Sequence, residues 1–306
     1  MKVKVGLDMG GTSIKMALLQ RDGGLLKKQS IPAYSGIPMK ERLKGMVAEI
    51  NAMLEADYEL QGIGIAFPGI VDFKNATILS HYVKYPDAHT MDLRKWAADH
   101  WGVPLIMEND ARAALLGEWH YGSGKGAQDL VMLTLGTGVG SAVLLNGQIL
   151  RGRNYIAGNL GGHMSIDFEG DQCNCGNLGC VETAGSTWAL NKNSLKLENP
   201  DASSINDGRE LSFKDVFEAA KAGDRLAMAL KERSLEAWSA AVINLIHAYD
   251  PERVILGGGI MESKEDIIPF IEKRVRERSW LTTDIAIVAA EQTKNAGILG
   301  VCSLLD

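Results

Sequence analysis

The sequence predicts an α/β protein with about two domains, and three observations support this prediction. Strand-like and helical segments alternate along the chain, which is typical of a parallel sheet covered by helices. Each half of the chain contains the same device, an apolar strand, a glycine-threonine turn and a second strand, over residues 8–19 and again over residues 129–145. The length of 306 residues corresponds to about two domains of ordinary size.

Composition excludes several classes of protein. With 46% hydrophobic and 23% charged residues, the chain has the composition of a folded globular protein. A net charge of −6 provides no basic surface for nucleic acid, and no apolar run approaches the roughly 20 residues that cross a bilayer. Met1 leads directly into a strand-like segment without an apolar signal. We therefore expect a cytoplasmic protein with no nucleic-acid or membrane partner.

The first glycine turn joins two predicted strands, residues 2–8 and 13–19. Gly10, Gly11 and Thr12, followed by Lys15, would allow main-chain N–H groups and polar side chains to close on phosphate oxygens. A plain β-hairpin turn is the alternative. Asp8, at the end of the apolar strand, favours the ligand site, because a carboxylate beside bound phosphates is suited to hold Mg²⁺.

The next segments predict a parallel sheet. Residues 39–54 have the periodicity of an amphipathic helix, and residues 61–67 form a strand that leads into a turn at Pro68 and Gly69. Gly69 would allow close approach of another group to the backbone. A second helix over residues 91–101 and a strand over residues 104–107 repeat the alternation.

Asn109 and Asp110 allow two interpretations. Asn or Asp before an alanine-rich helix, here residues 111–119, is commonly an N-cap. The same residues follow the carboxyl end of a strand, where open α/β sheets bind ligands. There, Asn109 would bind hydroxyl groups and Asp110 would accept a proton. The sequence favours neither interpretation over the other.

The second half repeats the glycine turn. Residues 129–135 and 141–145 are predicted strands, and Gly136, Thr137 and Gly138 lie between them. Two such turns could bind a nucleoside triphosphate from both sides. Helices are predicted over residues 213–222 and 224–249. The strand over residues 253–256 leads into Gly257, Gly258 and Gly259, which would admit a base or ribose or would form only a tight connection to the next helix.

A cysteine-rich segment predicts a structural zinc site. His163, Cys173, Cys175 and Cys180 offer one imidazole and three thiolates, the ligand set of tetrahedral Zn²⁺. Disulfides would suit a secreted chain, and an iron–sulfur cluster would need a fourth thiolate near the other three. Cys302 lies far from the other three cysteines, in an apolar segment that looks helical, so it is expected to be a buried, inert thiol. Four protein ligands leave no open coordination position, so the metal is expected to hold a loop.

Taken together, six motifs resemble those of the ROK sugar kinases. In chain order they are DMGGTSIK at residues 8–15, FPGIVD at 67–72, ENDARAALLGE at 108–118, LGTGVG at 135–140, GGH with CNCGNLGCVE within 161–182, and DPERVILGGG at 250–259. The resemblance extends to NAGILG at 295–300. It implies an actin/hexokinase-like (ribonuclease H-like) α/β fold with an interdomain cleft. Residues 1–117 and 289–306 would form a small domain, and residues 118–288 a large domain that carries the zinc loop.

The resemblance also implies an activity, the ATP-dependent phosphorylation of the 6-hydroxyl of a hexose. Asp110 would be the general base, and ATP would be bound with Mg²⁺ by the two glycine turns, with the third glycine segment near the adenosine. The ring would be positioned by Gly69, Asn109, His163 and Glu182. The family is often dimeric or tetrameric, so a homodimer or homotetramer is expected.

One departure from the family leaves the sugar open. The usual Glu-x-Gly-His is replaced by Asn159-Leu160-Gly161-Gly162-His163, so Asn159, or Leu160 by strict spacing, takes the place of the glutamate. An uncharged amide would change discrimination near C1 and C2. Glucose, N-acetylmannosamine, N-acetylglucosamine, fructose, allose and glycosides all stay candidate substrates.

Two non-enzymatic functions are the alternatives to a kinase. The family's transcriptional repressors carry a winged-helix domain before the first strand, whereas seven residues precede Asp8 here. A non-catalytic sugar sensor would be expected to lack the residue at Asp110, which this chain has.

Overall fold

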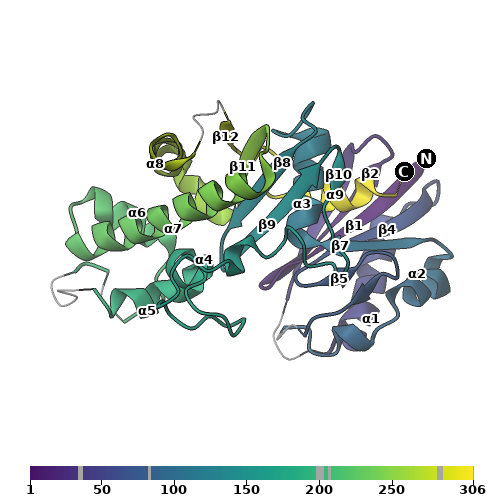
Figure 1. Cartoon of the computed structure of the whole chain (residues 1–306). Helices are drawn as coiled ribbons and strands as arrows, with labels where there is room; N and C mark the ends of the chain where they lie inside the picture. Colours follow the sequence, from purple (N-terminus) through teal and green to yellow (C-terminus); the bar gives the residue numbers. More distant parts are fainter. Residues whose placement is uncertain (34–36, 82–83, 198–202, 206–207, 281–284, 306) are drawn as a thin grey trace. The chain divides into compact units, whose positions relative to one another are not determined.

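The structure is a computed structural model that describes residues 1–33, 37–81, 84–197, 203–205, 208–280 and 285–305 (Figure 1). The chain forms two compact units. The first comprises residues 1–126, 151–157 and 294–306, and the second comprises residues 127–150 and 158–293. The short segment 151–157 thus leaves the second unit in sequence and packs with the first.

The first unit is built on a mixed five-stranded sheet in the order β3-β2-β1-β4-β7. β1 pairs antiparallel with β2 and parallel with β4, which in turn pairs parallel with β7. The strands are β1 (Lys2–Met9), β2 (Ser13–Gln20), β3 (Leu25–Pro32), β4 (Glu59–Phe67) and β7 (Leu105–Asn109), and a small ribbon is formed by β5 (Val71–Asp72) and β6 (Thr77–Ile78). β3 was not predicted, because its partly exposed edge position leaves it polar, without a regular apolar alternation.

Helices cover both faces of this sheet. α1 (Met39–Met53) and α2 (Leu93–Trp101) share a core with the apolar residues of β1 and β4, and η1 (Ala88–Thr90) lies nearby. α3 (Asp110–Tyr121) and α9 (Ala296–Ser303) pack on each other, and α9 contacts β1 and β4 through a second core that includes Cys302. The predicted buried thiol in a C-terminal helix is confirmed.

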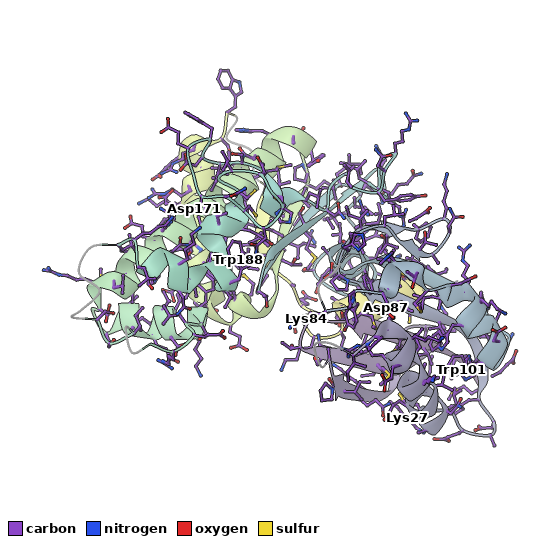
Figure 2. All side chains as sticks on the ribbon, turned by 90° about the horizontal axis from the view of Figure 1, so that it is seen from below. Lys27, Lys84, Asp87, Trp101, Asp171 and Trp188 are labelled. Carbon is purple, nitrogen blue, oxygen red and sulfur yellow. The ribbon has the colours of Figure 1, made fainter. Side chains whose placement is uncertain are left out.

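A distant carboxylate caps α1. The residue before this helix is Pro38, whose side chain makes no cap bond. Asp87, labelled in Figure 2, instead accepts hydrogen bonds from the N–H groups of Met39 at 2.6 Å and Lys40 at 3.3 Å. The start of α1 is therefore fixed by a tertiary contact.

The second unit has a sheet in the order β10-β9-β8-β11-β12. β8 pairs antiparallel with β9 and parallel with β11, and β11 pairs parallel with β12. The strands are β8 (Leu130–Leu135), β9 (Val139–Leu145), β10 (Gln148–Ile149), β11 (Arg253–Gly257) and β12 (Ala286–Ala289). This order and these directions match those of the first sheet, with β8 in the place of β1.

The long helix α7 (Arg225–Tyr249) packs against the sheet of the second unit (Figure 1). α6 (Phe213–Lys221) and α8 (Lys264–Arg278) flank α7 and share its core with β8 and β11. The shorter elements are η2 (Gly161–His163), α4 (Val181–Gly185), η3 (Thr187–Ala189), α5 (Leu190–Ser194) and η5 (Gly259–Ser263). The helices predicted over residues 213–222 and 224–249 are confirmed. Within the described ranges, no helix has both the length and the apolar character to cross a membrane.

Candidate functional site

The first glycine turn lies between β1 and β2, as predicted. Gly10 N–H donates to the Asp8 carbonyl at 3.0 Å, which makes the turn tight. The Gly10 carbonyl accepts from the Tyr85 hydroxyl at 2.8 Å, and the Thr12 carbonyl accepts from Ala33 N–H at 2.9 Å. The N–H groups of Gly11 and Thr12 meet no acceptor among the described residues, so they are available to an anion.

Asp8 carries the negative charge of this turn. It lies opposite Lys15 in the β1–β2 register, and Lys15 Nζ donates to Asp8 Oδ2 at 3.0 Å. Asp8 Oδ1 has no donor in the part of the chain that the structure describes. A half-buried carboxylate with one oxygen unoccupied suits Mg²⁺, which binds proteins through one or two carboxylates and completes its shell with water and phosphate.

Asn109 serves as the N-cap of α3. Its Oδ1 accepts from the N–H groups of Ala111 at 3.1 Å and Arg112 at 3.2 Å. Its Nδ2 donates to the Gly69 carbonyl at 3.0 Å and to Asp110 Oδ1 at 3.0 Å. The capping interpretation is confirmed, and the same amide also ties Asp110 to the turn at Gly69.

Asp110 begins α3 and is half-buried. Burial, together with the nearby Asp8 carboxylate, raises the pKa of Asp110 to about 6, against the hydrogen bond from Ala111 N–H, which lowers it. A carboxylate with its pKa near neutrality can accept a proton and release it again under physiological conditions. This combination of burial and a like charge is common at catalytic sites.

A buried ionic group lies directly beneath these residues. Glu108 and Arg112 are both fully buried, and Glu108 accepts from Arg151 Nε at 2.7 Å and from Asn109 N–H at 2.8 Å. Arg112 Nη2 donates to the Ala157 carbonyl at 2.6 Å. Segment 151–157 is therefore bound to the end of β7 and to the first turn of α3. Sequence reasoning did not find this contact, because nothing local to residues 151–157 specifies it.

The second glycine turn lies between β8 and β9, where it was predicted. Gly136 N–H donates to the Gly138 carbonyl at 3.0 Å. The Gly136 carbonyl accepts from Thr187 N–H at 3.1 Å and from Thr187 Oγ1 at 3.0 Å, and the Thr137 carbonyl accepts from Trp188 N–H at 3.3 Å. The N–H groups of Thr137 and Gly138 meet no acceptor among the described residues. Both turns thus have occupied carbonyls and available N–H groups.

Glu182 connects the second turn to the cysteine-rich segment. Its Oε1 accepts from Val139 N–H at 2.7 Å, and its Oε2 accepts from Trp188 Nε1 at 3.3 Å and lies 3.9 Å from His163 Nδ1. A Cβ on Gly138 would lie 2.3 Å from Glu182 Oε1, so only glycine fits there without movement of the carboxylate.

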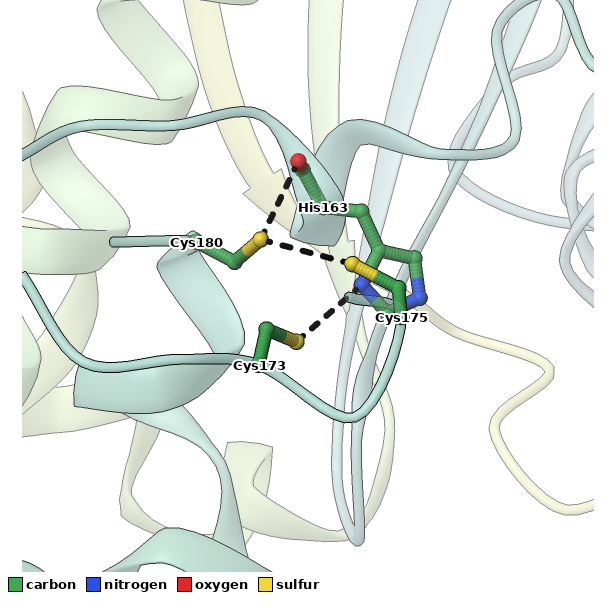
Figure 3. Close-up of side chains that lie close together, drawn as sticks. All are labelled: His163, Cys173, Cys175 and Cys180. Carbon is green, nitrogen blue, oxygen red and sulfur yellow. Dashed lines mark hydrogen bonds between the residues drawn. The ribbon is translucent and has the colours of Figure 1, made fainter. Parts of the chain in front are cut away.

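The four predicted zinc ligands converge (Figure 3). Their ligand atoms all lie within 4.8 Å of one another, with 3.6 Å between Cys173 Sγ and His163 Nδ1 and 3.7 Å between Cys175 Sγ and Cys180 Sγ. Two thiolates on tetrahedral Zn²⁺ are about 3.8 Å apart, and a thiolate and an imidazole nitrogen about 3.6 Å. The donor set and its spacing therefore fit Zn²⁺ with no open position.

Burial disfavours the ionisation of two thiols in this cluster. Burial raises the pKa of Cys173 and of Cys180 above the ordinary value of a thiol. A bound metal ion deprotonates a coordinating thiol and so offsets this penalty. The cluster is consistent with a metal centre rather than with a set of free reactive thiols.

The segment before His163 approaches β9 closely. Ser141 Oγ donates to the Gly158 carbonyl at 2.7 Å and accepts from Gly161 N–H at 2.7 Å, which fixes both sides of Asn159. A Cβ on Gly162 would lie 1.8 Å from the Val139 carbonyl. Asn159 is 7% exposed, and its Oδ1 has no hydrogen-bond partner in the described part of the chain. Such a buried acceptor suits a hydroxyl or N–H group of a ligand.

The two remaining predicted positions are turns after parallel strands. Gly69 follows β4 with φ of 132°, and Gly258 follows β11 with φ of 92°. Gly257 is buried, whereas Gly258 and Gly259 are exposed. Exposed backbone at the carboxyl end of a parallel strand is a common ligand position in α/β sheets.

Three contacts to the turns were absent from the sequence predictions, those of Tyr85, Thr187 and Trp188. Each reaches a turn from 50 or more residues away in the chain. The one available signal was the polar and aromatic Thr187–Trp188 pair directly after the cysteine-rich segment, which was not singled out.

Comparison with known proteins identifies the family. The model of the ROK family matches residues 4–306. A glucokinase from Thermotoga maritima is 33% identical, with 98% of this chain and 96% of the relative covered. A xylose repressor from Bacillus spizizenii is 28% identical, with 98% of this chain but 76% of the repressor covered.

The fold comparison agrees. The structure of a ROK family glucokinase from Streptomyces griseus, in complex with glucose and AMPPNP, matches with a TM-score of 0.81 at 27% identity and covers 99% of this chain and 98% of that one. The predicted actin/hexokinase-like α/β class is confirmed. On its motifs, its fold and its full-length match, this chain belongs to the ROK family.

Proposed function

We propose that the protein is an ATP-dependent sugar kinase that phosphorylates the 6-hydroxyl of a hexose or hexose derivative. The observation that carries this proposal is the pair of glycine turns, in which protein donors occupy the carbonyls while four N–H groups meet no acceptor among the described residues. Oriented N–H groups of this kind bind phosphate oxygens. The glucokinase relatives support the same reaction class.

The proposed roles follow from the chemistry of each residue. Asp8, Gly10, Gly11, Thr12 and Lys15 would bind phosphates and Mg²⁺. Gly136, Thr137 and Gly138 would bind the other side of the triphosphate, with Gly257, Gly258 and Gly259 near the nucleoside. Asp110 would take the proton of the attacking hydroxyl, since its carboxylate can ionise near neutral pH.

The sugar would be bound by residues that share buried or well-fixed positions. Asn109 and Asp110 are linked to each other and to Gly69 by hydrogen bonds, which would present one rigid edge to the ring hydroxyls. Asn159, His163 and Glu182 would contribute further contacts. The amide of Asn159 carries no charge and can both donate and accept hydrogen bonds, so glucose, N-acetylhexosamines, fructose, allose and glycosides stay candidates.

The test is ADP release from ATP and Mg²⁺ in the presence of a sugar panel. The panel comprises glucose, mannose, fructose, allose, glucosamine, N-acetylglucosamine, N-acetylmannosamine and a β-glucoside. Turnover that depends on one sugar, and that the matched variant Asp110→Asn loses, is the expected result. Equal ADP release with and without every sugar would contradict the proposal.

A second candidate is a sugar-binding regulator without catalysis. The observation in its favour is the xylose repressor relative, which aligns with 98% of this chain. Calorimetric binding of a sugar without turnover, together with a shift of operator DNA in a gel, would support this candidate. A homodimer or homotetramer stays a prediction from the family resemblance, and a cytoplasmic location stays a prediction from the sequence.

A further inference from the structure

The contacts of Glu182 concern the phosphate-binding turn rather than the sugar alone. Its Oε1 accepts from Val139 N–H at 2.7 Å, and Val139 directly follows the proposed phosphate-binding residue Gly138. The same oxygen fills the space that a side chain at Gly138 would occupy, at 2.3 Å from the ideal Cβ position. The conformation of the turn therefore depends on where this carboxylate lies.

The helix that carries Glu182 is fixed at both ends. α4 has five residues, which is too short for a helix to be stable alone. At its C-terminal end, the Ala184 carbonyl accepts from Ser234 Oγ at 3.1 Å and the Gly185 carbonyl accepts from Trp238 Nε1 at 2.8 Å, both from α7. At its N-terminal end, the cap residue is Cys180, one of the four metal-ligand candidates.

The segment after α4 completes the connection. Thr187 and Trp188 donate to the carbonyls of Gly136 and Thr137, and Trp188 Nε1 also donates to Glu182 Oε2 at 3.3 Å. Trp188 is labelled in Figure 2. One continuous stretch, from Cys180 to Trp188, thus begins in the metal cluster and ends on the phosphate turn. Without a metal the four ligand side chains would lose their common partner, and only the surrounding hydrogen bonds, such as those from Val181 N–H to the Met164 carbonyl at 3.1 Å and from Asn177 Nδ2 to the His163 carbonyl at 3.3 Å, would hold this stretch.

We propose that the zinc centre positions the second glycine turn, residues 136–138, through Glu182 and Trp188, and so sets the affinity of the protein for the nucleotide. Glu182 is then a positioning residue for the second turn in addition to any contact that it makes with sugar. This inference rests on the proposed function, because it takes the nucleotide as the ligand of residues 136–138. It differs from a purely structural metal, which would affect folding or sugar binding and leave nucleotide affinity unchanged.

The experiment measures binding of a non-hydrolysable ATP analogue with Mg²⁺, by titration calorimetry, in the absence of sugar. The samples are the zinc-loaded protein, the protein after chelation, and the chelated protein after zinc is restored. We expect chelation to weaken binding about tenfold and zinc to restore it. Circular dichroism before and after chelation shows whether the fold is retained.

Variants distinguish the effect of the Glu182 and Trp188 contacts from the effect of the metal itself. Glu182→Gln keeps an oxygen acceptor for Val139 N–H and is expected to retain nucleotide affinity, whereas Glu182→Ala and Trp188→Phe are expected to weaken it with zinc still bound. A sugar contact that needs the carboxylate charge would instead raise the KM for sugar in Glu182→Gln. Cys175→Ser removes one of the four candidate metal ligands. Its control is Cys302→Ser, which changes a cysteine outside the cluster.

Two results would overturn the inference, and they are distinguishable. Equal nucleotide affinity in the zinc-loaded, chelated and Glu182→Ala proteins would leave the proposed kinase function intact and remove the coupling. Failure of the zinc-loaded wild type to bind the ATP analogue at all would remove the proposed function and the coupling together.

Discussion

The two glycine turns occupy equivalent places in their sheets but are stabilised in different ways. Each lies between the central strand and its antiparallel neighbour, in sheets with the same strand order. The first turn contains an ion pair, Asp8 with Lys15, opposite each other in the ladder. The equivalent pair in the second sheet is Thr134 with Gly140, which carries no charge.

The second turn depends on contacts from outside its own hairpin. Glu182, Thr187 and Trp188 all bind to it, and they follow the cysteine-rich segment in sequence. The first turn has its own charged side chains, and the proposed role of the Asp8 carboxylate is to bind a metal ion. The second is held by contacts from the segment that follows the candidate zinc ligands. A repeated backbone motif has thus acquired two different supports, and the predictions below test them separately.

The largest effect is expected at the carboxylates of the first unit. Asp110→Asn should lower the rate of phosphoryl transfer about a thousandfold with sugar affinity nearly unchanged, because the variant keeps the hydrogen-bonding shape but cannot take a proton. In the wild type, the rate should fall as the pH drops below about 6, the pKa of Asp110. Steady-state kinetics across pH would show both, and retained turnover would remove Asp110 as the base.

The same variant also makes a prediction for stability. Since the folded-state pKa of Asp110 is raised, its ionisation destabilises the fold as the pH rises from its ordinary value of 3.8 toward about 6. Asp110→Asn should therefore unfold at a higher temperature than the wild type at pH 8 and at the same temperature near pH 4. An equal difference at both pH values would point to a change in packing instead.

The next effect concerns the shape of the second turn. Gly138→Ala should lower turnover about a hundredfold, because the new Cβ would displace either Glu182 or the N–H groups that are proposed to bind phosphate. Gly136→Ala is the matched control, since its Cβ would meet nothing within 4 Å. Kinetics with varied ATP would measure the difference. Similar losses in both variants would show that the turn needs backbone freedom rather than space beside Glu182.

The contrast between the turns also explains what the sequence could predict. Gly10 with Gly11 and Gly136 with Gly138 were found because glycine between two strand patterns is a local signal. The zinc ligands were found because three lie within eight residues and the fourth lies ten residues before them. The contacts that support the turns were not predicted, because Tyr85, Thr187 and Trp188 lie 50 or more residues away in the chain from the turn residues that they bind. The sequence could not decide between a capping role and a ligand-site role for Asn109, because the same side chain caps α3 and also contacts Gly69 and Asp110.

A smaller effect is expected at the helix caps. Although partial burial opposes ionisation, the N–H groups of Ala227 and Ser204 and the hydroxyls of Ser203 and Ser204 lower the pKa of Asp224 to about 2. A lowered carboxylate pKa stabilises the fold above its ordinary value of 3.8, and this stabilisation is lost as the pH falls toward 2.

Asp224→Asn should accordingly lower the free energy of unfolding by about 1 kcal/mol at pH 7 and by little near pH 2. The control is Asp92→Asn in the first unit, where the cap of α2 accepts one hydrogen bond, from Lys95 N–H at 2.9 Å. Urea titrations at both pH values would measure these differences. A larger loss in the Asp92 variant would contradict the ranking.

The smallest effect is expected from the ion pair of the first turn, and it shows in salt dependence rather than in stability. The Lys15 and Asp8 side chains are 34% and 20% exposed, so Lys15→Met should change the free energy of unfolding by less than about 1 kcal/mol. Nucleotide affinity should fall about threefold at low salt and be equal to that of the wild type at high salt, where exposed charges are screened. The second turn has no charge in the equivalent ladder pair, so the first turn should account for most of the salt dependence. If Lys15→Met kept the salt dependence of the wild type, the charge that attracts the nucleotide would have to lie elsewhere. The proposed difference between the two turns, one supported by charge and the other by contacts from another segment, would then be wrong.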